Sequence, residues 1–169
     1  ATAVIVGFVY PFFEGIAWNQ HFAVQAWIKA VTGDEFHDFA GSVVVHAVGG
    51  WIALPAVLLL GARYNRYRKD GAISAHPPSS IPFLALGAWI LIVGWFGFNA
   101  GSALAASGLA SSAFVATHLA SAAGAVSWML AEKFHNGRAS ALGAISGSVA
   151  GLATVTQGAG FVQPFSAVL

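Results

Sequence analysis

The sequence predicts an all-α fold, a polytopic bundle of transmembrane helices, from its composition and from its apolar stretches. Hydrophobic residues make up 57% of the 169 residues and charged residues only 8%, whereas soluble domains have roughly 25% charged residues. The mean hydropathy is +0.74. Five apolar stretches have about the 20 residues that a helix needs to cross a bilayer. We therefore expect a multi-pass protein of the cell (plasma or inner) membrane.

The five stretches are interpreted as one membrane domain that occupies residues 1–169. The first is interrupted by Pro11 and Glu14, and the third opens with Ser80 as a cap and Pro82 in its first turn, where proline is tolerated. The fifth is the shortest and the richest in glycine. Helices are expected at residues 2–21, 39–60, 81–105, 109–131 and 140–156, with the start of another at residue 164.

Glycine recurs every four residues in the fifth stretch, at Gly143, Gly147 and Gly151. Residues at this spacing share one face of a helix. Small residues on such a face let two helix backbones approach closely in a membrane. We interpret this face as a helix-packing surface.

The distribution of basic residues predicts the orientation of the chain. Four lie between the second and third helices and two between the fourth and fifth, which places both groups on the same side of the membrane. Only Lys29 falls in the other loops. The positive-inside rule makes the side with six of the seven basic residues cytoplasmic.

Five residues form a candidate cation-binding site toward the outer face. Trp18 ends the first helix, Asp38 precedes the second, and Phe98 and Ser102 lie near the end of the third. His46 lies deeper, eight residues beyond Asp38, and an ionisable side chain at that depth is a functional-site hypothesis by default. Aromatic faces attract a cation, and a hydroxyl oxygen can replace a water of its hydration shell.

Each of these residues also has a structural interpretation. His46 could bond to a neighbouring helix, Asp38 could cap the second helix, and Trp18 could be an interfacial residue. His118, in the middle of the fourth helix, is more simply explained as an interhelical hydrogen-bonding residue than as a pore residue. A weaker alternative is a cofactor-binding helical subunit that uses His46 and His118, which a haem absorbance spectrum would test.

The sequence lacks the residues that several other classes of function require. The chain has no cysteine and a net charge of +1, so thiol chemistry and electrostatic binding of nucleic acid are excluded. No catalytic nucleophile, metal-ligand cluster or phosphate-binding loop is recognisable. We therefore expect no enzyme activity, no metal and no cofactor.

Two long motifs resemble the ammonium transporters (the Amt/Mep/Rh family), and the Amt branch in particular. They are Asp38-Phe39-Ala40-Gly41-Ser42-Val43-Val44-Val45-His46 and Gly94-Trp95-Phe96-Gly97-Phe98-Asn99-Ala100-Gly101-Ser102. Shorter matches extend the resemblance over nearly the whole chain. It covers the fourth to the eighth transmembrane helix of the family and the start of the ninth.

The resemblance implies an eleven-helix fold made of two inverted repeats, which assembles as a homotrimer with one pore in each subunit. Trp18, Phe98 and Ser102 match the outer recruitment site for ammonium, and Asp38 matches the acidic residue that supports it. Phe98 is also a gate residue, and His46 matches the first of two pore histidines. The second histidine belongs to a helix outside this sequence.

The implied function is transport of ammonium or ammonia as a transporter or channel. Ammonium is recruited at an outer vestibule and loses a proton, and neutral ammonia then crosses an apolar pore that excludes ions. Neutral imidazoles can hydrogen-bond ammonia and relay a proton. In this family the cytoplasmic face can also receive a PII-type signal protein.

The first helix departs from the family pattern. Asn19-Gln20-His21 follows Trp18 where the family has a glycine-rich run, and the loop at residues 22–37 is longer than expected. Glu14 lies one helical turn before Trp18, where it would add negative potential below the vestibule. These changes are compatible with an alternative function, an ammonium sensor that uses the same fold as a receptor.

Overall fold

A computed structural model describes residues 1–74 and 76–169, and it confirms the predicted all-α class. Within these residues there is no β-strand, only an isolated bridge between Tyr67 and Ile73. The helical elements, in chain order, are α1 (Thr2–Val4), the π-helix η1 (Ile5–Val9), α2 (Tyr10–Ala17), the 3₁₀ turn η2 (His21–Ala23), α3 (Val24–Thr32), the π-helix η3 (Ser42–Ala47), α4 (Val48–Leu60), α5 (Ile81–Gly101), α6 (Gly108–Asn136), α7 (Ala141–Val155) and the 3₁₀ turn η4 (Pro164–Val168).

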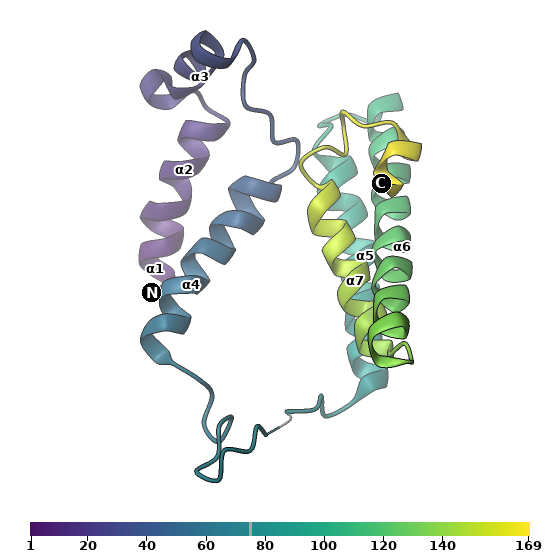
Figure 1. The fold of residues 1–169 in the computed structure, drawn as a ribbon. Coiled ribbons are helices and arrows are strands. Elements are labelled where there is room, and N and C mark those ends of the chain that lie inside the picture. The colour runs from purple at the N-terminus through teal and green to yellow at the C-terminus, as the bar shows by residue number, and fades with distance from the viewer. Residues whose placement is uncertain (75) are drawn as a thin grey trace.

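The helices form two arms, as Figure 1 shows. Elements α1 to α4 make one arm, and α5, α6 and α7 pack side by side in the other. The described residues between α4 and α5, 61–74 and 76–80, lie at one end of the arms, which is also the end of the turn between α6 and α7. The two basic loops therefore lie at the same end of the molecule, as the charge distribution predicts. The arms meet at the opposite end, where α7 finishes beside the start of η3.

Three helical segments are long and apolar enough to cross a membrane: Ser42–Leu60, Ile81–Gly101 and Gly108–Asn136. Two further apolar helices, Thr2–Ala17 and Ala141–Val155, are shorter. Large apolar side chains cover their outer surfaces, and Leu59, for example, is 87% exposed. Such surfaces are stable in contact with lipid or with other apolar helices. These helices and surfaces are those of a multi-pass membrane protein.

The helix boundaries differ most from expectation around the first loop. The first helix ends at Ala17 rather than at residue 21, because Gln20, Phe22 and Ala23 all have left-handed backbone angles (φ 56° to 60°). The expected loop then contains a helix of its own, α3. It ends at Gly33, whose φ of 90° favours glycine at a helix C-terminus.

The later boundaries shift by a few residues. The second spanning helix begins at Ser42 rather than residue 39, because Gly41 has a φ of 118° and cannot be helical. The third ends at Gly101, four residues early, and the fourth continues to Asn136, five residues beyond expectation. The C-terminal residues Pro164–Val168 form a 3₁₀ turn.

Helices α6 and α7 pack backbone against backbone at their glycines. A Cβ atom built on Gly147 would collide with the carbonyl oxygen of Gly124, and one on Gly151 with that of Ala120. Gly143 instead faces the carboxylate of Glu132. Two of the three glycines of the predicted packing face therefore contact the α6 backbone, and the third accommodates a side chain.

We expect Gly147→Ala to separate α6 from α7 and to lower the free energy of unfolding by about 1–3 kcal/mol, the usual cost of overpacking. Thermal unfolding of the purified protein in detergent measures this. Gly87→Ala is the matched control, because a Cβ there meets no atom within 4 Å. Equal melting temperatures for the two variants would contradict the close packing.

Candidate functional site

Asp38 organises the start of the helix that carries His46. Its carboxylate is 6% exposed and accepts four backbone N–H bonds. Oδ1 accepts from Gly41 (3.0 Å) and Ser42 (2.9 Å), and Oδ2 from Val43 (2.9 Å) and Val44 (2.8 Å). These are the free N–H groups that begin a helix, where a negative charge is favourable. The expected capping bonds are present, but the N-cap residue itself is Gly41 rather than Asp38.

His46 lies in the π-helical turn Ser42–Ala47, and its backbone N–H bonds to the carbonyl oxygen of Gly41, five residues earlier. π-Helical turns are rare in proteins, and those that occur are often found at functional sites. The Nε2 atom of His46 is buried, and none of the described residues hydrogen-bonds to it. A buried polar nitrogen of this kind is available to a ligand or to a group outside residues 1–169.

Two aromatic rings of α5 hold the His46 imidazole. The indole of Trp95 stacks on it with a centroid separation of 5.0 Å and an interplanar angle of 21°. The ring of Phe98 lies 5.8 Å away at 45°, and it also contacts the Trp95 ring at 6.0 Å. Phe98 and His46, from motifs about fifty residues apart in the chain, are therefore neighbours in space.

The remaining candidate residues, Trp18, Asp38 and Ser102, line a pocket of about 460 Å³ at the end of the molecule where the arms meet. The Trp18 indole donates to the backbone carbonyl of Asp38 (2.7 Å), which fixes the ring beside the pocket. The hydroxyl of Ser102 donates to the carbonyl of Phe98 (2.8 Å), so its oxygen lone pairs remain available as acceptors.

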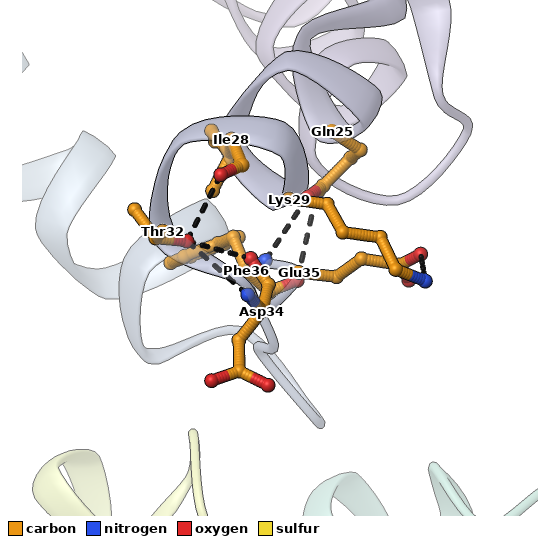
Figure 2. A network of polar contacts seen from close by, with 7 residues as sticks. All are labelled: Gln25, Ile28, Lys29, Thr32, Asp34, Glu35 and Phe36. Atoms are coloured by element: carbon orange, nitrogen blue, oxygen red, sulfur yellow. Dashed lines mark hydrogen bonds and ion pairs between the residues drawn. The ribbon is translucent and has the colours of Figure 1, made fainter.

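Helix α3 forms one side of this pocket, a feature that the sequence did not predict. Gln25 is 7% exposed, donates to the carbonyl of Ala17 (2.6 Å) and accepts from the N–H of Phe36 (3.1 Å). Figure 2 shows the contacts of Gln25 with Phe36, in the segment that follows α3. The available signal was the helical spacing of apolar residues from Val24 to Val31 before Gly33.

Lys29 and Glu35 form an ion pair at the same edge of the pocket. Glu35 lines the pocket, and its carboxylate accepts a hydrogen bond from Lys29 Nζ at 3.0 Å. This hydrogen bond, and then the positive charge of Lys29, lower the pKa of Glu35 below its ordinary value. Glu35 is therefore ionised, with its charge largely neutralised by its partner (Figure 2).

The C-terminal end of α7 is hydrogen-bonded to the segment that follows Asp38. The N–H of Phe39 donates to Gln157 (2.9 Å) and that of Ala40 to Thr156 (3.2 Å). The hydroxyl of Ser42 donates to the carbonyl of Ala153 (2.6 Å) and accepts from the N–H of Gln157 (2.7 Å). We call these four bonds between residues 39–42 and 153–157 the clasp. The clasp joins the two arms directly beside Asp38.

Three polar residues of the first and fourth predicted helices do not line this pocket. His118 is exposed, its ring is 6.1 Å from Phe96, and none of the described residues forms the interhelical hydrogen bond expected of it. His21 packs against the backbone of Gly15, where a Cβ would lie 2.5 Å from its Nδ1. Glu14 is partly buried on α2, one turn before Trp18.

The fold is that of a multi-pass helical membrane protein, with a polar, aromatic-lined pocket and a half-buried histidine, His46, packed against Trp95 and Phe98. The sequence model of the Ammonium Transporter Family matches residues 1–169. The chain belongs to this family, as its two long motifs predict.

Curated relatives and solved structures support the same family assignment. The chain is 42% identical to the ammonium transporter Amt2 of Archaeoglobus fulgidus, over 99% of this chain and 36% of Amt2. It is 41% identical to an ammonium transporter of Aquifex aeolicus, over 92% of this chain and 33% of the relative. A structure titled Sensor Amt Protein matches with a TM-score of 0.87 and 36% identity, over 99% of this chain and 41% of that one. Saccharomyces cerevisiae Mep2 matches with a TM-score of 0.70 and 38% identity, over 78% of this chain and 29% of that one.

The chain thus spans about a third of the length of the curated relatives that it matches. These relatives are named transporters rather than enzymes.

Proposed function

We propose that this chain forms part of a membrane pathway for ammonium or ammonia and is not an enzyme. The observation that carries the proposal is the His46 imidazole, with an unpartnered Nε2, held by Trp95 and Phe98 beside a pocket lined by Trp18 and Ser102. A small cation needs an aromatic and oxygen-rich vestibule, and a neutral molecule needs a hydrogen-bonding group inside an apolar pore.

Recruitment takes place in the pocket. A cation between Trp18, Phe98 and Ser102 exchanges water for aromatic faces, which contribute about 0.5–2 kcal/mol each, and for the serine oxygen. Asp38 supports the site indirectly, because its carboxylate is fully used by backbone N–H groups. It holds the helix start in place and adds negative charge below the pocket.

Passage requires the loss of a proton. An ammonium ion cannot enter the apolar space beside His46 without a large desolvation cost, whereas ammonia can. Nε2 of His46 is placed to exchange a hydrogen bond, or a proton, with the molecule that enters. We infer that Phe98, whose ring contacts His46 and which lies one helical turn before Ser102, acts as a gate between the pocket and His46.

The remaining parts of the pathway lie outside residues 1–169. We propose that further helices supply a second pore histidine, that the protein works as a homotrimer, and that its cytoplasmic face is open to a PII-type signal protein. The family to which the chain belongs and its coverage of about a third of each relative support this.

The second candidate function is an ammonium sensor, favoured by the match to Sensor Amt Protein over 99% of this chain. Uptake of labelled ammonium or methylammonium, in cells that lack other ammonium transporters and express the protein carrying this chain, separates the two. Saturable uptake supports transport. Binding without uptake supports the sensor and contradicts the transport proposal.

The charge of the pocket gives a further prediction. Lys29→Met removes the partner of Glu35 and leaves its negative charge free beside the vestibule, so we expect the apparent KM for ammonium to fall about twofold at low ionic strength. Salt should suppress the effect, because Glu35 is exposed to solvent. At pH 7 the carboxylate is ionised in both proteins, since losing Lys29 only returns its pKa to the ordinary carboxylate range.

Uptake measured at several ammonium concentrations, with and without added salt, tests this prediction. Lys29→Arg keeps the ion pair and serves as the control. Glu35→Gln alone should have the opposite effect and raise the apparent KM, because it leaves the positive charge of Lys29 unpaired beside the pocket. An apparent KM that is unchanged or lower in Glu35→Gln would contradict the explanation.

A further inference from the structure

Thr156, at the end of α7, is connected to His46 through a single intermediate residue. The indole Nε1 of Trp95 donates to the hydroxyl oxygen of Thr156 at 2.9 Å. The same hydroxyl donates to the carbonyl of Leu152 at 2.7 Å. Because the one hydroxyl proton is used by that carbonyl, the oxygen can only accept from the indole. Thr156 is 0% exposed, so water does not compete for this bond.

This hydrogen bond restrains rotation of the Trp95 ring about its Cβ–Cγ bond, because that rotation would carry the N–H away from Thr156. The N–H edge of the indole bonds to Thr156, and one face stacks on His46 with a centroid separation of 5.0 Å. The ring also contacts Phe98, with a centroid separation of 6.0 Å. An indole without a partner for a half-buried N–H loses a hydrogen bond and tends to reorient toward another acceptor. Thr156 therefore determines where the face of Trp95 lies.

Within residues 1–74 and 76–169, no hydrogen bond restrains the imidazole of His46 in this way. None of the described residues hydrogen-bonds to its ring, and Nε2 is buried without a partner. Its orientation in this part of the protein depends on the stack with Trp95 (21° between planes) and on Phe98. Any rotation of the indole is passed on to the nitrogen that we assign to the pathway.

We propose that Thr156 is a positioning residue: through the Trp95 indole it sets the direction of His46 Nε2. The inference rests on the proposed role of His46 in transport. It extends the working site from the η3 and α5 motifs to α7. Thr156 also belongs to the clasp, because its backbone carbonyl accepts a hydrogen bond from the N–H of Ala40 beside the pocket. One residue therefore takes part in both the clasp and the positioning of His46.

Transport kinetics of Thr156→Val and Thr156→Ser test the proposal in the protein that carries this chain. Valine keeps the shape and removes the acceptor, and serine keeps the hydroxyl. We expect Thr156→Val to lower the maximal rate of methylammonium uptake about five- to twentyfold per folded protein in the membrane, with the apparent KM unchanged within twofold. Thr156→Ser should retain the wild-type rate within twofold.

A double variant separates positioning from a general loss of stability. Trp95→Phe removes the indole N–H, so adding Thr156→Val to it should cost less than a further twofold. Independent, multiplying losses would overturn the proposal, as would a normal rate in Thr156→Val. His46→Ala, measured in parallel, separates the proposed transport role of His46 from the positioning role of Thr156. Wild-type uptake in His46→Ala contradicts the proposed pathway, independently of the result for the Thr156 variants.

A spectroscopic measurement does not depend on transport. In protein labelled with ¹⁵N-histidine, the imidazole signals of His46 are assigned by their loss in His46→Ala. We expect these signals to shift or broaden in Thr156→Val and to match wild type in Thr156→Ser. Unchanged His46 signals in a folded Thr156→Val protein would overturn the inference even if the protein proves to be a sensor.

Discussion

Replacing His46 with alanine should reduce the uptake of methylammonium at least about tenfold while the protein remains folded in the membrane. The imidazole supplies a buried nitrogen without a partner among the described residues, and Trp95 and Phe98 hold its ring in place. A molecule of ammonia that loses such a hydrogen-bonding group in a dry lumen loses about 1–3 kcal/mol. Since 1.4 kcal/mol corresponds to a factor of ten, the expected loss of rate is large.

The matched control is His118→Ala. This histidine also belongs to a spanning helix, but it lies exposed beside Phe96 rather than in the stack with Trp95. We expect less than a twofold change in uptake. The two imidazoles contact different rings of α5, which also argues against a cofactor held between His46 and His118. Wild-type uptake in His46→Ala, at normal abundance, would contradict the proposed pathway.

Changing Asp38 to asparagine should destabilise the whole site. The carboxylate accepts four N–H bonds, whereas an amide oxygen can accept only two and the amide nitrogen is itself a donor. At least two buried N–H groups therefore lose their partner, at about 1–3 kcal/mol each. We expect the free energy of unfolding to fall by about 2–4 kcal/mol and uptake to fall with it.

Thermal unfolding in detergent, together with uptake per folded protein, measures the effect of Asp38→Asn. Asp34→Asn is the control, because Asp34 is exposed and only its backbone groups bond to Thr32. We expect that control to unfold at the wild-type temperature. A stable Asp38→Asn protein with impaired uptake would contradict the structural role and assign Asp38 a direct contact with the cation.

The sequence predicted those parts of the fold that depend on local pattern. Apolar stretches of spanning length, the cap at Ser80 and the glycine face of α7 all follow from hydropathy, capping and side-chain size. The Ser80 hydroxyl does accept from the N–H of Phe83. The family was predictable because its two motifs are long and lie unbroken in the chain.

The sequence could not predict features that depend on contacts between distant residues. Helix α3 was expected to be loop, because nine residues give a weak signal and Gln25 stabilises the helix through bonds to Ala17 and Phe36. The bond from Trp95 to Thr156 joins residues 61 positions apart. Gln20, Phe22 and Ala23 have left-handed backbone angles although none of them is glycine, and residue propensities do not predict this either.

The clasp has a consequence for biogenesis. Its Ser42 bonds join residues 111 to 115 positions apart, so the two sides of the clasp are made at very different times during synthesis. When the ribosome has completed η3 and α4, the partners of Phe39, Ala40 and Ser42 do not yet exist. Contacts of such long sequence separation form late. The vestibule therefore stays incomplete until α7 has been synthesised and inserted.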